Sequence, residues 1–258
     1  EAWAGALPFT LTGAQERAIG EVLADLAADF PGHRLLHGDV GAGKTAVAGA
    51  ALLAVARAGR QAALMAPTEL LAEQHYRVLA DWFRDLGWSV HLLTGSSSSG
   101  EAATTRKALS TGAAQIVIGT HALFQRGVRF RDLALVVVDE QHRFGVRQRA
   151  ELTGKGLAPN LLVMSATPIP RTLALTAYGD FDVSVLDELP PGRQPVHTQV
   201  LGKRERRRAY ESLVQHVSAG RRAFVVCPVI EEGAREYVAS AQEVFERLQE
   251  QVPALRWG

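Results

Sequence analysis

A run of residues around position 40 has the composition of a phosphate-binding loop. The stretch Gly38-Asp39-Val40-Gly41-Ala42-Gly43-Lys44-Thr45 fits the pattern G-x-x-x-x-G-K-[ST]. Its glycines allow the backbone to wrap closely around a ligand and to aim successive N–H groups at phosphate oxygens. We expect Lys44 to reach the β- and γ-phosphates and the Thr45 hydroxyl to bind Mg²⁺. The sequence therefore predicts a site for ATP and Mg²⁺, formed by Gly38, Val40, Gly41, Ala42, Gly43, Lys44 and Thr45.

A pair of carboxylates further along the chain suits the same chemistry. The apolar run 136–138 ends in Asp139-Glu140. Phosphoryl transfer to water needs a carboxylate that holds the metal and a group that orients or deprotonates the water. We assign the first role to Asp139, acting through Mg²⁺-bound water, and the second to Glu140. An isolated Asp-Glu pair is commonly a solvated strand end, but a phosphate-binding loop in the same chain favours the catalytic interpretation.

Both motifs follow short apolar runs, and such runs recur along the chain. They lack the period-2 alternation of half-exposed strands, so they suit a parallel sheet that is covered on both faces. We predict strands at 34–37, 62–66, 90–93, 115–119, 133–138, 161–165 and 182–186. Helices are expected at 12–29, 46–58, 69–85, 101–111, 146–152 and 170–177. This alternation predicts an α/β fold with a doubly wound parallel sheet and helices on both faces.

Polar residues collect directly after the predicted strands. Open parallel sheets bind ligands along the edge where the carboxyl ends of their strands meet. Besides the phosphate-binding loop, the polar clusters lie at 67–69, 94–95, 120–121, 139–142 and 166–167. We therefore expect one extended site along this edge. The serine-rich run 96–100 is interpreted as a surface loop.

The last quarter of the chain indicates a second α/β unit. Two prolines and a glycine in Leu189–Arg193 end the alternating pattern and mark the expected boundary. Beyond it we predict strands at 196–201 and 223–228 and helices at 203–219 and 235–251. The predicted domains are a first lobe at 1–188, a linker at 189–198 and an incomplete second lobe at 199–258.

Composition limits the possible classes of protein. The chain has 258 residues, of which 47% are hydrophobic, so it can bury a substantial core. A net charge of +1 neither demands nor excludes nucleic acid, and any basic surface must be local. A single cysteine, Cys227, rules out an intrachain disulfide and suits a reducing cytoplasm. We expect no transmembrane helix, because no apolar run approaches about 18 residues.

The residues around the carboxylate pair carry a resemblance to a known family. Asp139-Glu140-Gln141-His142 resembles the DEAD/H-type motif of superfamily 2 helicases and translocases. Two longer runs, 139–149 and 167–171, are similar to the RecG family of bacterial branched-DNA helicases, and the likeness extends over most of 7–232. This resemblance implies a RecA-like motor lobe followed by the start of a second RecA-like lobe. Transcription-repair coupling factors share much of it but usually carry Glu where Gln141 stands.

The resemblance also implies roles for individual residues. Gln15 would recognise adenine through its amide, with Phe9 near the base, although Gln15 is also placed to form a capping box with Thr12. Residues along the DNA backbone would be Thr68, Glu69, Thr94, Gly95, Thr120 and His121. Residues that couple the nucleotide site to the DNA would be His142, Ser165, Thr167 and Arg171. A structural role remains an alternative for both histidines, as does a solvated basic face for Arg143, Arg147, Arg149 and Arg171.

The expected function is that of an ATP-dependent DNA motor. It would couple ATP hydrolysis to movement on duplex DNA at stalled replication forks and Holliday junctions, in recombination and repair, in the bacterial cytoplasm near the nucleoid. The alternatives are the motor of a transcription-repair coupling translocase and a nucleotide-binding scaffold that does not hydrolyse ATP. The family's wedge domain would precede Glu1, and its arginine fingers would follow Gly258. We therefore expect residues 1–258 alone to be a poor ATPase.

Overall fold

The computed structural model describes residues 2–125, 127–139, 158–166, 181–188, 196–227, 240–252 and 255–257. The chain separates into two compact units, 1–193 and 194–258. The division between them falls within the residues expected to form a linker, 189–198.

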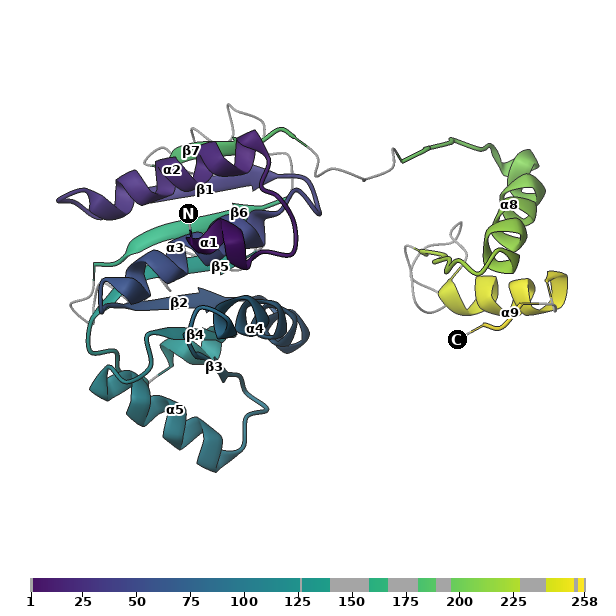
Figure 1. The fold of residues 1–258 in the computed structure, drawn as a ribbon. Coiled ribbons are helices and arrows are strands. Elements are labelled where there is room, and N and C mark those ends of the chain that lie inside the picture. Colours follow the sequence, from purple (N-terminus) through teal and green to yellow (C-terminus); the bar gives the residue numbers. More distant parts are fainter. Residues whose placement is uncertain are drawn as a thin grey trace. The chain divides into compact units, whose positions relative to one another are not determined.

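The first unit is built on a seven-stranded parallel sheet (Figure 1). Its strands are β1 (His33–Gly38), β2 (Gln61–Met65), β3 (Val90–Leu93), β4 (Ile116–Gly119), β5 (Leu133–Asp139), β6 (Asn160–Ser165) and β7 (Asp182–Leu186). The strand order is β3-β4-β2-β5-β6-β1-β7, and all six neighbouring pairs are parallel. The seven strands predicted from the apolar runs are confirmed, each to within one residue at either end.

Helices cover both faces of the sheet. The helices are α2 (Gly13–Ala27), α3 (Lys44–Arg57), α4 (Glu69–Arg84), α5 (Ser99–Thr111) and the 3₁₀ helix η1 (His121–Phe124). Helices α2, α3 and α4 share one core with Leu64 and Val137, whereas α5 and η1 share the opposite core with Val136 and Val163. This arrangement confirms the doubly wound α/β class. The helices predicted at 146–152 and 170–177 lie outside the described residues.

The interpretation of residues 96–100 as a surface loop is confirmed for 96–98 and wrong for Ser99 and Gly100, which begin α5. Ser98 is the N-cap of α5, and it forms a capping box with Glu101. The Glu101 N–H donates to Ser98 Oγ over 3.3 Å, and the Ser98 N–H donates to Glu101 Oε2 over 3.2 Å. The Thr94 N–H donates to Ser97 Oγ over 3.0 Å. Short hydroxyl side chains satisfy backbone donors at turns and helix starts, so this run forms an ordered turn and the first residues of a helix.

A short N-terminal helix, α1 (Ala2–Ala6), was not expected from the sequence. Its buried Trp3 packs edge-on against Trp82, with ring centroids 5.7 Å apart, and lies 5.4 Å from the ring of Phe83. Gly49 of α3 provides the space for this ring. Phe9, which was expected near the adenine base, packs against Trp82 at 5.9 Å. These aromatic contacts attach α1 to α3, the helix that follows the phosphate-binding loop, and to α4.

The second unit contains helices but no strand among its described residues. It has η3 (Lys203–Glu205), α8 (Arg206–Ser218) and α9 (Ala241–Gln251), which confirm the two predicted helices over these ranges. The strands predicted at 196–201 and 223–228 are wrong for the residues described there, which have no regular structure. Val200 and Val226 are 96% and 90% exposed. A strand needs neighbours that pair with its N–H and C=O groups, and the described part of this unit supplies none.

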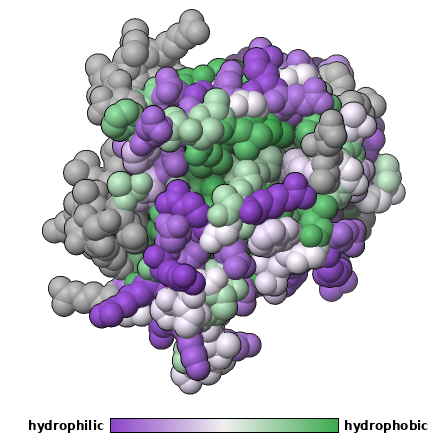
Figure 2. Space-filling model, turned by 60° about the vertical axis from the view of Figure 1, so that its left-hand side comes forward, coloured by the Kyte–Doolittle hydropathy of each residue, from purple (hydrophilic) through white to green (hydrophobic). Residues whose placement is uncertain are grey.

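The surface of the molecule mixes apolar and polar residues. Figure 2 shows one face, on which hydrophobic residues form a patch bordered by hydrophilic residues. Large apolar side chains that remain exposed in the first unit include Phe30, Val40 and Leu70. Within the described ranges, no helix is both long and apolar enough to cross a membrane.

Candidate functional site

The phosphate-binding loop connects β1 to α3 at the carboxyl edge of the sheet. Gly43 has φ +85°, in the left-handed region that favours glycine, and a Cβ at this position would overlap the amide of Gln15. A Cβ at the buried Gly38 would lie 2.9 Å from Cβ of Leu186 on the neighbouring strand β7. Backbone conformation and close packing therefore explain the glycines at both ends of the loop.

Lys44 lies within the loop that would surround the phosphates. Its Nζ donates to the carbonyl oxygens of Gly38 and Asp39, over 2.6 and 3.0 Å. Lys44 is also the first residue of α3, whose N-terminal N–H groups and dipole favour an anion. The loop, the ammonium group and the helix start together fit the β- and γ-phosphates of a nucleotide.

Gln15 fastens the start of α2 to this loop. Its side chain is buried, and Oε1 accepts the Thr12 N–H over 2.9 Å, which confirms the predicted capping box. Its Nε2 donates to the Ala42 carbonyl over 2.9 Å. Since both ends of the amide are engaged, Gln15 holds the loop in place. Recognition of adenine by the same amide stays a prediction.

Asp139 is the last residue of β5 and is largely buried. Successive strand side chains point to opposite faces, so Asp139 shares the face of Leu135 and Val137, which α3 and α4 cover. Its Oδ2 accepts a hydrogen bond from Nε2 of His75, a residue of α4, over 2.7 Å. Glu140, His142 and Thr167 lie outside the described residues.

The oxygen donors on this face suit Mg²⁺, which prefers carboxylate, hydroxyl and phosphate oxygens. Asp139 ends β5, and Thr45 stands in the first turn of α3 on the same side of the sheet. Among the described residues, no group of three or more His, Cys, Asp or Glu side chains could hold a metal ion. Mg²⁺ at a nucleotide site needs no such cluster, because one or two protein oxygens, phosphates and waters complete its shell.

The strand order divides the carboxyl edge into two halves. The phosphate-binding loop follows β1, Asp139 ends β5 and the buried Ser165 ends β6; these three strands are adjacent. The residues predicted to lie along DNA follow β2, β4 and β3, which are adjacent at one end of the sheet. Since β2 pairs with β5, the two halves meet there.

Several residues of the predicted DNA track hold turns. The Leu71 N–H donates to Oγ1 of Thr68, the N-cap of α4, over 3.3 Å. Glu69 Oε1 accepts the Ser96 N–H over 3.0 Å and so fixes the turn after β3. The hydroxyls of the buried Thr94 and Thr120 also serve local turns. Gly95 and His121 are exposed, and contact of this track with DNA stays a prediction.

An ion-pair cluster joins α2 to β1 and β7, with Arg34 near the start of β1. Arg34 of β1, whose side chain is 12% exposed, donates to Asp25 Oδ1 over 2.9 Å and to Ser184 Oγ over 3.1 Å. Glu21 accepts from Arg34 over 3.3 Å. The hydrogen bond to Asp25 raises the pKa of Arg34, as expected for a guanidinium beside a carboxylate. The cluster holds α2, and hence Gln15, against the sheet.

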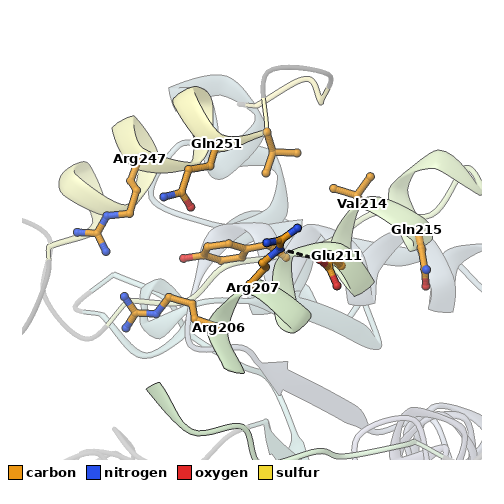
Figure 3. A pocket seen from close by; sticks show the side chains of 9 residues that line it. Arg206, Arg207, Glu211, Val214, Gln215, Arg247 and Gln251 are labelled. Atoms are coloured by element: carbon orange, nitrogen blue, oxygen red, sulfur yellow. Dashed lines mark hydrogen bonds and ion pairs between the residues drawn. The ribbon is translucent and has the colours of Figure 1, made fainter. Parts of the chain in front are cut away.

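The second unit has a cavity of its own, about 780 Å³ in volume, between α8 and α9 (Figure 3). Arg206 and Arg207 line it from α8, and Arg247 lines it from α9. Arg207 donates to Glu211 over 3.0 Å, so part of the positive charge is paired. None of the site residues predicted from the sequence lines this cavity.

Sequence reasoning missed one residue at the site, His75. It lies in a stretch that carries the family resemblance, but no motif pattern assigns it a role. The available signal was its place in α4, where the apolar residues Ala72, Leu79 and Phe83 form the buried stripe. His75 lies three residues after Ala72 and four residues before Leu79, so the helical period puts its polar ring on the core face.

Comparison with known proteins places the chain in a family. The sequence profile of the DEAD/DEAH box helicase family matches residues 12–176. The match covers the phosphate-binding loop, Asp139 and the whole strand set from β1 to β6. The chain belongs to the DEAD/DEAH box helicase family.

Within this family the chain is similar to RecG, as the sequence motifs predicted. It is 51% identical over 252 residues to the ATP-dependent DNA helicase RecG of Synechocystis sp., covering 98% of the chain and 30% of that protein. It is 48% identical over 249 residues to RecG of Aquifex aeolicus, covering 96% of the chain and 31% of that protein. A structure of RecG bound to a three-way DNA junction matches 97% of the chain, with 43% identity and a TM-score of 0.83. The chain spans about a third of the length of these relatives.

Proposed function

We propose that the chain is part of an ATP-dependent DNA motor that acts on branched DNA in recombination and repair, in the bacterial cytoplasm near the nucleoid. The observation that carries this proposal is the division of the carboxyl edge. A phosphate-binding loop and a buried carboxylate occupy one half, and exposed polar turns occupy the other. The matched RecG structure is bound to a three-way DNA junction, which supports branched DNA as the substrate.

In this proposal the residues of the nucleotide half have distinct tasks. The loop N–H groups and Lys44 bind the phosphates and stabilise the charge that develops during transfer. Thr45 and Asp139 hold Mg²⁺, which neutralises phosphate charge when it is bound. Glu140 orients and deprotonates the attacking water. Gln15 positions the loop through Ala42 and recognises adenine.

The residues of the other half bind the DNA backbone. The exposed groups of these turns, at Thr68, Gly95 and His121, can donate to phosphate without reading bases, so binding is largely independent of sequence. His142, Ser165, Thr167 and Arg171 couple this half to the nucleotide half. We also propose that residues 199–258 begin a second motor lobe, because the matched RecG structure covers 97% of the chain.

The test is ATP hydrolysis with and without forked DNA, measured on the protein at the full length of its relatives. Lys44→Ala should abolish hydrolysis, because the charge that develops on the transferred phosphate loses its nearest ammonium group. Lys107→Ala, an exposed lysine on α5, is the matched control and should keep full turnover. DNA-stimulated turnover at the normal rate in Lys44→Ala would contradict the proposal. Equal stimulation by forked and linear duplex DNA would remove branched DNA as the preferred substrate.

A further inference from the structure

His75 is a polar residue in a core position. It lies on α4 in line with the buried side chains of Ala72, Leu79 and Phe83, and its own side chain is 11% exposed. A polar group in such a position is tolerated only when it is hydrogen-bonded, because its interaction with water is lost. The partner of the ring should therefore explain why this core position carries a histidine and not an apolar residue such as leucine.

The ring contacts the carboxylate to which we assign the metal. His75 Nε2 lies 2.7 Å from Asp139 Oδ2, and the Asp139 side chain is 13% exposed. An ionised carboxylate can only accept, so Nε2 carries the hydrogen and donates it. Among the described residues, His75 is the one side chain that hydrogen-bonds to this carboxylate. The contact occupies Oδ2 and fixes the rotation of the carboxylate, which also fixes the direction of Oδ1.

The fold makes this contact between the two halves of the carboxyl edge. Helix α4 follows β2, β2 pairs with β5, and Asp139 ends β5 on the face that α4 covers. His75 therefore comes from the half with the exposed turns, whereas the carboxylate it holds belongs to the half with the phosphate-binding loop.

We propose that His75 is a positioning residue that orients Asp139 for the Mg²⁺ of a bound nucleotide. This inference rests on the function proposed above. Groups that hydrogen-bond to metal-binding carboxylates set the ligand geometry, and their loss typically weakens metal binding or activity by roughly 10–100-fold. In this role His75 acts through Asp139.

A purely structural role for His75 would have a different signature. If the hydrogen bond only attached α4 to the sheet, its loss would lower stability and weaken nucleotide binding equally with and without Mg²⁺. A positioning role affects only the part of the affinity that depends on Mg²⁺. The two roles are therefore separated by the metal dependence of nucleotide binding, which can be measured without turnover.

The experiment measures binding of a fluorescent ADP analogue to the 258-residue chain, in EDTA and over a Mg²⁺ titration, together with the thermal unfolding midpoint. His75→Leu removes the donor and suits the apolar stripe of α4. His75→Gln keeps a donor of similar reach. Arg77→Leu is the matched control, since Arg77 is on the same helix and its side chain is 77% exposed.

We expect His75→Leu to bind the analogue normally in EDTA and to require about 10–100-fold more Mg²⁺ for the metal-dependent gain in affinity. His75→Gln should recover much of this loss, and Arg77→Leu should match the unaltered chain. An unchanged Mg²⁺ requirement, or a lower one, in His75→Leu would overturn the proposal. Equal losses with and without Mg²⁺ would also overturn it in favour of a structural role. If the unaltered chain bound no nucleotide, the proposed function itself would fail.

Discussion

The contact between Trp3 and Gly49 gives a sharp prediction about how α1 is attached to α3, the helix that follows the phosphate-binding loop. A Cβ on Gly49 would lie 2.5 Å from Cη2 and 2.6 Å from Cζ2 of Trp3. Non-bonded carbons prefer about 3.5–4.0 Å, so the ring would have to retreat by roughly 1 Å. The N-terminal helix α1 carries this ring, and Gly49 lies in α3 five residues after Lys44. We therefore expect Gly49→Ala to loosen the attachment of α1.

Two opposing terms set the size of the effect. Alanine is favoured over glycine inside a helix by about 0.5–1 kcal/mol, and Gly49 does not have the positive φ that would oppose it. Overpacking typically costs about 1–3 kcal/mol. The sum is a net loss of about 1 kcal/mol, within a range of roughly 0–2.5 kcal/mol, while Trp3 is present. In the Trp3→Ala background the clash with the indole is gone, so Gly49→Ala should stabilise by up to about 1 kcal/mol.

Leu79 sets an upper limit on this gain. Its Cδ2 would lie 3.1 Å from the added Cβ, so the leucine must shift by a few tenths of an ångström even without the indole.

Trp3→Ala alone should cost less than the roughly 3–5 kcal/mol of a fully buried tryptophan. A terminal helix can detach without unfolding the sheet, and the measured loss is then limited to the free energy with which α1 docks.

The assay is urea unfolding followed by circular dichroism, on Gly49→Ala, Trp3→Ala, the double variant and the unaltered chain. Gly20→Ala is the matched control, because Gly20 lies inside α2 and an added methyl group would have no neighbouring atom within 4 Å. It should stabilise by about 0.5–1 kcal/mol in both backgrounds. The reasoning predicts a change of sign for Gly49→Ala between the two backgrounds. The same sign in both would refute it.

Three further predictions concern the site and its support. Glu140→Gln, at the full length of the relatives, should keep ATP binding and slow hydrolysis by about 10²–10⁴, and hydrolysis at the normal rate would rule out the assigned role. Arg34→Met should cost about 2 kcal/mol, less than the roughly 3–5 kcal/mol of a fully buried pair, because Glu21 is 38% exposed. Arg34 donates to both carboxylate oxygens of Asp25, through Nε and Nη2, and Arg34→Lys should not restore this two-bond contact. Burial lowers the pKa of His91, so the folded state resists protonation of this ring. The free energy of unfolding should therefore fall as the pH drops below about 6.5. Unfolding midpoints measured at several pH values should fall less in His91→Gln.

Much of the fold was predictable because its signals are local. The strands are continuous apolar runs, and their boundaries follow the polar turns to within one residue. The glycines and Lys44 of the loop are required by backbone conformation, which a short pattern captures. The loop predicted at 96–100 ends two residues early, because the spacing of Ser98 and Glu101 forms a capping box that starts α5 at Ser99. Composition alone does not contain that spacing.

Other features depend on contacts between distant segments. The docking of Trp3 against Gly49 and Trp82 joins three helices, and nothing in the short sequence of α1 indicates it. The predicted strands of the second unit had suitable apolar runs, but a strand also needs partners, and pairing is not a property of the run itself. The contact between His75 and Asp139 likewise depends on the strand order, because only the adjacency of β2 and β5 brings α4 over the end of β5.

Because of this strand order, α4 contacts both halves of the carboxyl edge. The helix begins at Thr68 and Glu69, in the half of the edge with the exposed turns, and Glu69 holds the turn after β3. Two helical turns further on, His75 holds the carboxylate of Asp139 in the other half. Beyond its first turn, each N–H of the helix donates to the carbonyl four residues earlier, which ties its successive turns together. A displacement of its first turn would therefore also move the imidazole that orients Asp139. We infer that α4 connects the predicted DNA track to Asp139, the carboxylate to which we assign the metal.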